Sequence, residues 1–180
     1  AATLLKNSDS QNIQFYYDAL LKGSICAIES GNPASAISPL EYLTSISDQK
    51  FQNQKIESCL NLFRAYSLLD MNREIVDVFT RLSPGNIPQN EYHLLATYTA
   101  NACVQLKEYT KAYDLYFNLV KNASSDVAVD ALKSLWNIEK NISNKNMEKV
   151  LLEAEKRLEE NPLLIADFRT RLGIDSFREG

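Results

Sequence analysis

Apolar residues recur at helical spacing along this chain of 180 residues, and this periodicity constrains the fold more than any other feature. Side chains three and four positions apart share one face of a helix. The clearest stripe begins at Tyr109 and continues through Ala112, Tyr113, Tyr116 and Val120. No sustained alternation of apolar and polar residues and no Asn-Gly or Asp-Gly pair indicates a hairpin of strands. The sequence therefore predicts an all-α fold.

Polar turns separate the apolar stripes. The segments 31–33, 70–72 and 83–88 carry the Gly, Asn, Asp and Pro residues that favour turns. Ser124 is a candidate N-cap, and Asn161 before Pro162 is expected to end a helix. These breaks predict helices of roughly 12–17 residues joined by short loops. Pro39 falls inside one of them and is expected to kink or delay it.

The turns fall at a near-constant period, which indicates a repeat. The equivalent turn positions are Gly31, Asp70, Lys107, Lys145 and Gly180, with spacings of 39, 37, 38 and 35 residues. Two short helices cannot bury their apolar faces alone, and stacking of the next pair covers them. We therefore predict a single repeat domain over residues 1–180. Its helix pairs are predicted at 13–46, 55–83, 91–122 and 127–160, with a partial fifth at 163–180 that points to a longer parent protein.

The segment 105–116 resembles the tetratricopeptide repeat (TPR). It has a turn, the aromatic Tyr109 after it, then Ala112, and Tyr116 four positions later. Pro162 is similar to the proline that terminates a unit of this family. The resemblance covers about residues 13–180, although the period of 35–39 is longer than the 34 of the family. It implies a right-handed α-solenoid of antiparallel helical hairpins (TPR-like), whose concave groove binds a peptide or protein segment.

Groups for catalysis or metal binding are scarce, with one histidine and three cysteines in the chain. His93 has no nucleophile or paired carboxylate near it in sequence, so a structural or solvated role is predicted. The cysteines have no Cys-x-x-C spacing and are predicted to be small, reduced core residues; they are Cys26, Cys59 and Cys103. We expect no catalytic residue, no metal site and no cofactor, and hence a protein that is not an enzyme. A carboxylate-based activity stays open.

The acidic residues near the C-terminus lie among basic ones. Glu153 stands three positions before Lys156 and four before Arg157, which are the spacings of ion pairs along a helix. A solvated helix face is therefore predicted there.

The resemblance also indicates which residues face the groove. The predicted partner-binding residues are Leu60, Arg64, Thr97, Asn101, Leu135 and Trp136. Arg64 and Asn101 are expected to hold a polar group of the ligand. The remainder of the carboxylate clamp that some TPR domains share is absent, so binding of chaperone tails is not predicted. Two readings stay open for Trp136, which either anchors a partner or packs between helix pairs.

The function predicted from these observations is a scaffold or adaptor that binds another protein. The net charge of −4 without a basic block predicts no nucleic-acid partner. No apolar run approaches the roughly 18–20 residues that span a bilayer, so no membrane insertion is predicted. The exposed terminal repeat offers a surface for self-association.

Three alternatives stay open. A reduced thiol set favours the cytoplasm, but residues 124–132 resemble junctions in bacterial cell-envelope repeat proteins, and the initial Ala1 fits a removed signal. In the cell-envelope alternative, the chain is a component of a periplasmic assembly. It is otherwise an accessory domain of a longer enzyme, or a module that assembles with further copies of itself.

Overall fold

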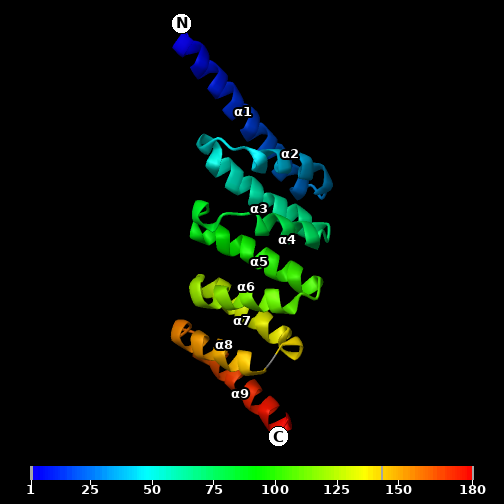
Figure 1. Ribbon diagram of the computed structural model, residues 1–180, viewed down its shortest axis with the longest axis vertical. Helices are drawn as coiled ribbons and strands as arrows, with labels where there is room; N and C mark the ends of the chain where they lie inside the picture. The colour runs from blue at the N-terminus through cyan, green and yellow to red at the C-terminus, as the bar shows by residue number, and fades with distance from the viewer. Residues whose placement is uncertain (1, 143, 180) are drawn as a thin grey trace. The chain divides into compact units, whose positions relative to one another are not determined.

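The computed structural model describes the backbone of residues 2–142 and 144–179 and the side chains of residues 12–83, 85–142 and 146–173. In these ranges the backbone forms helices joined by turns, and no strand occurs among the described residues, which confirms the predicted all-α class (Figure 1). The chain divides into two compact units, Ala1–Ile87 and Pro88–Gly180.

The described residues of unit 1 form four α-helices. Helix α2 packs against both α1 and α3, and α3 packs against α4. A short 3-10 helix at Gln49–Phe51 leads into α3, and another at Pro84–Asn86 follows α4. The helices are α1 (Ala2–Glu29), α2 (Ala34–Ser45), α3 (Gln52–Leu68) and α4 (Asn72–Thr80).

In unit 2 the part of the chain that the structure describes forms five α-helices and a 3-10 helix at Glu139–Asn141. Helix α6 is central, because it packs against α5, α7 and α8, and α8 in turn packs against α9. The helices are α5 (Gln89–Gln105), α6 (Tyr109–Asn122), α7 (Ser125–Asn137), α8 (Asn144–Arg157) and α9 (Pro162–Glu179).

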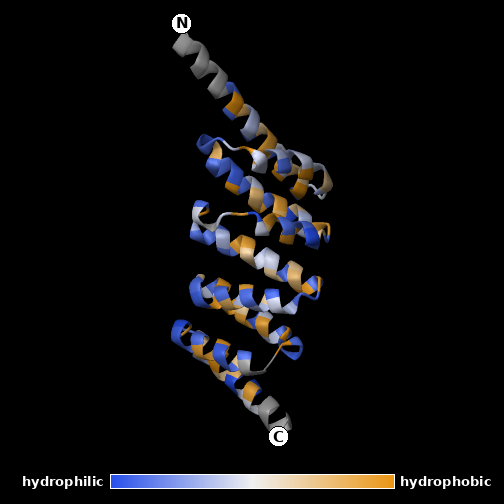
Figure 2. Ribbon diagram, viewed as in Figure 1, coloured by the Kyte–Doolittle hydropathy of each residue, from blue (hydrophilic) through white to orange (hydrophobic). Residues whose placement is uncertain are grey.

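Helical periodicity explains which face each helix buries. In α7 the buried residues are Ala128, Ala131, Leu132 and Leu135, which recur at intervals of three, one and three positions. Apolar and polar residues accordingly alternate around each helix in Figure 2. Full burial of one leucine side chain contributes about 1.5–3 kcal/mol, so these stripes supply much of the stability of each unit. Of the predicted stripe of α6, Tyr109 is half-buried and the other four residues are buried, together with Leu119.

The first helix ends in the same way at three of the predicted turns. Gly31, Asp70 and Lys107 all have positive φ, at 83°, 54° and 61°. In each case the following N–H donates back to the carbonyl five residues earlier, which is the Schellman motif. These bonds join Asn32 to Ala27, Met71 to Tyr66 and Glu108 to Cys103, with N···O distances of 2.9, 2.9 and 2.8 Å.

The fourth turn differs from its prediction. Lys145 lies inside α8, which begins at Asn144, so it is wrong as a turn position. The chain leaves α7 through Ile138 and the 3-10 helix Glu139–Asn141, using bonds between residues three apart. Ile138 and Glu139, at this turn, are buried. Gly180, the fifth turn position, lies outside the described residues.

Helix lengths vary more than the predicted range. Helix α1 has 28 residues and α4 has 9. Helix α2 runs from Ala34 to Ser45 with Pro39 inside it, so the expected delay of this helix is not found. Ser124 is the N-cap residue of α7, as predicted, although its side chain makes no cap hydrogen bond. Helix α8 ends at Arg157, before the predicted end at Asn161, and Pro162 begins α9.

Alanine substitutions at two glycines of unit 1 are expected to have opposite effects. Gly31→Ala places a Cβ on a left-handed residue and should lower the free energy of unfolding by about 1 kcal/mol. Gly23→Ala lies inside α1 and should raise it by about 0.5–1 kcal/mol, through the higher helix propensity of alanine. A Cβ at either position meets nothing within 4 Å, so packing does not contribute. Urea unfolding followed by circular dichroism measures both changes, and equal signs would contradict the turn assignment.

Candidate functional site

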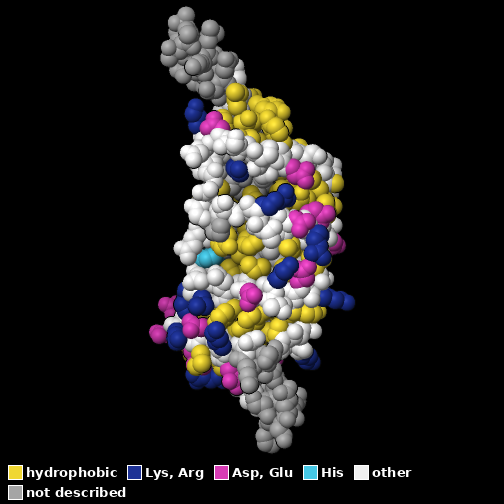
Figure 3. Space-filling model, in the orientation of Figure 1, with side chains coloured by type: hydrophobic (Ala, Val, Ile, Leu, Met, Phe, Trp, Pro, Cys, Tyr) yellow, Lys and Arg dark blue, Asp and Glu magenta, His cyan; other side chains and the backbone are white. Residues whose placement is uncertain are grey.

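A group of large apolar side chains lies exposed on unit 1, and we name it the tyrosine surface. It consists of Ile13, Phe15 and Tyr16 from α1 and Tyr42 from α2, with exposed fractions of 44%, 76%, 53% and 48%. Figure 3 shows apolar side chains (yellow) gathered over this part of α1 and α2, near the top of the view. Isolated exposed apolar residues are normal, but contiguous groups mark surfaces that bind other molecules.

Tyr17 supports this surface from beneath. Its ring lies edge-on to that of Phe51, with 4.7 Å between centroids, and is 6.1 Å from Tyr42 and 5.9 Å from Tyr16. The pKa of the Tyr17 hydroxyl is raised, mainly by a hydrogen bond with Tyr42 and to a lesser extent by partial burial. These contacts hold two of the exposed rings in place, which lowers the entropy lost when a partner binds.

The sequence alone did not reveal the tyrosine surface. Ile13 and Tyr16 belong to the same apolar stripe as Leu21 and Ile28. Of these four residues, only Leu21 and Ile28 are buried, with exposed fractions of 5% and 4%. Periodicity identifies the apolar face of a helix but does not show whether a neighbour covers it, so no sequence signal separates the two halves of this stripe.

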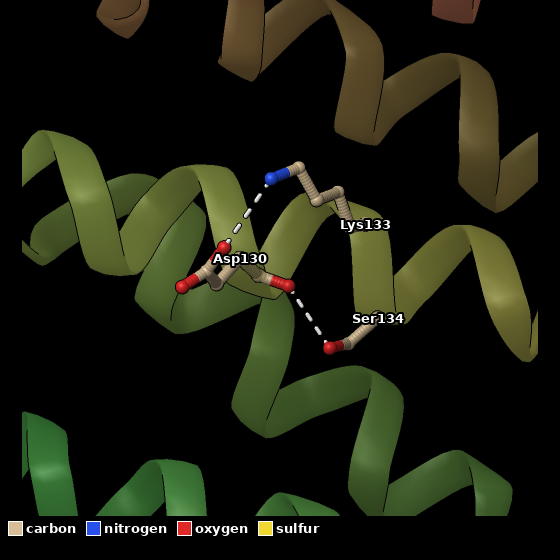
Figure 4. Close-up of polar contacts among 3 residues, drawn as sticks. All are labelled: Asp130, Lys133 and Ser134. Carbon is tan, nitrogen blue, oxygen red and sulfur yellow. Dashed lines mark hydrogen bonds and ion pairs between the residues drawn. The ribbon is translucent and has the colours of Figure 1, made fainter.

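Unit 2 contains a polar pocket of about 360 Å³. The lining residues carry amides, hydroxyls and aliphatic groups and no charge; they are Asn101, Val104, Gln105, Tyr116, Ser134, Asn137 and Ile138. Tyr116 Oη donates a hydrogen bond to Asn101 Oδ1 at 2.5 Å. Ser134 Oγ donates to the Asp130 carbonyl at 2.9 Å, and Asp130 also pairs with Lys133 at 3.4 Å (Figure 4). Neutral donors and acceptors of this kind fit amide or hydroxyl groups of a ligand.

The predicted partner-binding residues differ in accessibility. On α3, Arg64 is exposed and Leu60 is half-buried. On α5, Asn101 is exposed at the polar pocket, whereas half-buried Thr97 donates to the His93 carbonyl at 2.9 Å. Binding of a partner by these residues stays a prediction.

The two predicted residues on α7 pack within unit 2. Leu135 is 0% exposed, so its side chain offers no surface. The half-buried Trp136 ring lies edge-on to Phe168 of α9, with 5.4 Å between centroids, and Arg171 lies 5.9 Å from the Trp136 centroid. The structure therefore gives Trp136 a packing contact, which is one of its two predicted readings.

His93 is buried, with 5% of its surface exposed. Burial, and then the positive charge of Arg157, lower the pKa of its imidazole. The guanidinium of Arg157 donates hydrogen bonds to the carbonyls of Lys121 and Ala123 at the end of α6, the latter at 2.7 Å. These bonds replace the predicted Glu153–Arg157 ion pair, whereas the predicted Glu153–Lys156 pair is confirmed at 3.2 Å.

Other reactive groups are dispersed. Cys59 and Cys103 are buried as predicted, but Cys26 is exposed, and none of these three described residues forms a disulfide. Burial raises the pKa of the Cys59 thiol to about 12. Within the described ranges, no three His, Cys, Asp or Glu side chains lie close enough to hold a metal ion. No described helix combines the length and apolarity that would let it cross a membrane.

Comparison of the chain with models of protein families, with curated proteins and with solved structures finds no match in any of the three. Functional inference therefore rests on the residues and geometry of this chain. Its two strongest surface features are the tyrosine surface of unit 1 and the polar pocket of unit 2.

The lowered pKa of His93 predicts loss of stability in mild acid. Between the ordinary pKa of 6.5 and the lower value of the folded state, the unfolded chain binds more protons. The stability that the neutral His93 imidazole contributes to the folded state is complete above pH 6.5 and is lost as the pH falls below that value. Melting temperatures measured from pH 7.5 to 5 should therefore fall for the wild type and fall less for His93→Gln. Equal pH dependence of the two proteins would contradict this assignment.

Proposed function

We propose that this chain is a non-catalytic scaffold or adaptor that binds another protein. The observation that carries the proposal is the tyrosine surface, where four large apolar side chains of α1 and α2 lie exposed. Leaving such groups in water costs free energy that a partner recovers on binding. Soluble chains therefore keep contiguous groups of this kind chiefly where they are used.

The composition of the surface favours a protein partner. Tyrosine and other aromatic residues are concentrated among those that dominate protein interfaces. Their rings offer large contact areas with few rotatable bonds. Phe15, with 76% of its surface exposed, is the natural anchor for an apolar pocket or helix face of the partner. The net charge of −4 further favours a protein or peptide over a nucleic acid.

The polar pocket of unit 2 suits a second kind of contact. Its amides and hydroxyls match the alternating N–H and C=O groups of an extended polypeptide. Asn101 is accessible there and keeps its side-chain amide N–H groups for a ligand, since its oxygen accepts from Tyr116. We infer that Asn101 contributes to partner binding, with Arg64, Leu60 and Thr97 as further contacts.

We also propose that both units belong to one TPR-like array, a right-handed α-solenoid of helical hairpins over residues 1–180. The three Schellman turns at 31, 70 and 107 support a repeat of 39 and 37 residues. A similar hydrogen bond recurs in both units, with its glutamine donors 37 positions apart and its acceptors 36 positions apart. Gln52 Nε2 donates to the Asn86 carbonyl at 2.9 Å in unit 1, and Gln89 Nε2 donates to the Asn122 carbonyl at 3.4 Å in unit 2.

Removal of the exposed aromatic rings should abolish capture of the partner. We expect the double variant Phe15→Ser, Tyr16→Ser to lose at least about 30-fold in affinity, which is the effect of removing one strong interface anchor. A quantitative pull-down from native lysate, with circular dichroism to confirm folding, measures this loss.

The matched control removes exposed apolar groups elsewhere. Leu152→Ser with Leu163→Ser changes residues that are 58% and 86% exposed in unit 2 and should leave capture unchanged. Capture that is equal for both double variants, or no specific capture by the wild type, would refute the proposal. Loss of capture only with Arg64→Ala, Asn101→Ala would assign binding to the predicted groove residues instead.

A further inference from the structure

A second pocket lies within unit 1 and encloses about 160 Å³. A cavity of about 150 Å³ admits a molecule the size of benzene, so this pocket suits a small group. It is formed by the end of α2, the first two turns of α3 and the segment after α4. The lining residues are Thr44, Gln52, Lys55, Ile56, Cys59, Arg81, Leu82, Ser83, Asn86 and Ile87.

Hydrogen bonds to backbone carbonyls hold the polar walls of this pocket. Lys55 Nζ donates to the Ile46 carbonyl at 3.1 Å, and Gln52 Nε2 donates to the Asn86 carbonyl at 2.9 Å. Arg81 donates through Nε to the Asp77 carbonyl at 3.1 Å, which leaves the two terminal nitrogens of its guanidinium for another acceptor. Both cations are thus positioned by the backbone while keeping donors to spare.

The charge in this pocket is unbalanced. Lys55 and Arg81 are basic, and none of the described residues that line the pocket is acidic. Acidic residues on the surrounding helices are Glu41 of α2, which accepts a hydrogen bond from Tyr66 Oη at 2.7 Å, Glu57 of α3, and Asp77 of α4, one turn before Arg81. The Cys59 thiol in the wall stays neutral near pH 7, because burial raises its pKa to about 12.

Repeat packing does not require these two cations. The turns at Asp70 and Lys107 place equivalent residues 37 positions apart. By this register Lys55 corresponds to Tyr92 and Arg81 to Asn118, which are both neutral. The positive charge is therefore particular to this pocket and is not part of the repeat pattern.

We propose that the pocket of unit 1 binds a small amphipathic anion. A carboxylate or phosphate group is held by Lys55 and Arg81, and a short apolar stem lies against Ile56, Leu82 and Ile87. Ion-paired hydrogen bonds supply the specificity for the anionic group. The apolar wall selects against free inorganic ions, whose hydration it does not replace. The proposal does not rest on the proposed protein-binding function.

Titration of the full chain with hexanoate, inorganic phosphate and the neutral hexanamide tests the proposal. Amide shifts in two-dimensional NMR spectra locate binding, and shifts of Cys59, Leu82 and Ile87 should saturate with hexanoate, with a phosphate monoester such as butyl phosphate, or with both. Hexanamide should bind at least about tenfold more weakly, because it lacks the charge. Arg81→Gln and Lys55→Gln should each weaken anion binding about tenfold.

Lys22→Gln is the matched control, since it removes one exposed positive charge from α1 of the same unit and should not alter binding. Circular dichroism confirms that each variant folds. The proposal is overturned if neither organic anion gives saturable shifts, if hexanamide binds equally well, or if Lys22→Gln weakens binding as much as Arg81→Gln. If inorganic phosphate binds as tightly as butyl phosphate, the proposed contribution of the apolar stem is contradicted. A preference between hexanoate and butyl phosphate identifies the anionic group.

Discussion

The left-handed residue that ends the first helix of a pair is the constraint on which the rest of each unit depends. Helices of this length are marginal alone and gain their stability from packing. The turn at Gly31, Asp70 or Lys107 closes the first helix with two backbone hydrogen bonds and returns the chain at once. The next helix then lies against the first, and both bury their apolar stripes. A longer or looser connection would cost more entropy and leave those stripes in water.

The helical class and most turns could be predicted from the sequence, because they depend on local chemistry. Glycine and polar residues mark Gly31 and Asp70, and alignment of the apolar pattern around these turns identifies Lys107, which has no intrinsic preference for positive φ. The same alignment fails at Lys145. There the chain turns at the buried residues Ile138 and Glu139, and burial is a property of the whole unit.

The candidate sites could be predicted less well, for the same reason. An apolar stripe looks alike in sequence whether or not a neighbour covers it, so Ile13 and Tyr16 were indistinguishable from Leu21 and Ile28. The two pockets are formed by residues from three segments each, and their shapes follow from tertiary packing. Asn101 is the predicted residue that lies at a pocket, whereas Leu135 is sealed inside unit 2. Exposure, rather than residue type, separates the features that can act on another molecule.

The packing of Trp136 has a spectroscopic consequence. It is the one tryptophan of the chain, and its indole ring is held against Phe168 of α9 within unit 2. Tryptophan fluorescence, excited selectively, therefore reports on that unit alone, whereas far-ultraviolet circular dichroism averages over every helix. Whether the two signals change together on denaturation reveals if the units lose their structure as one cooperative body or in succession, without any label being introduced.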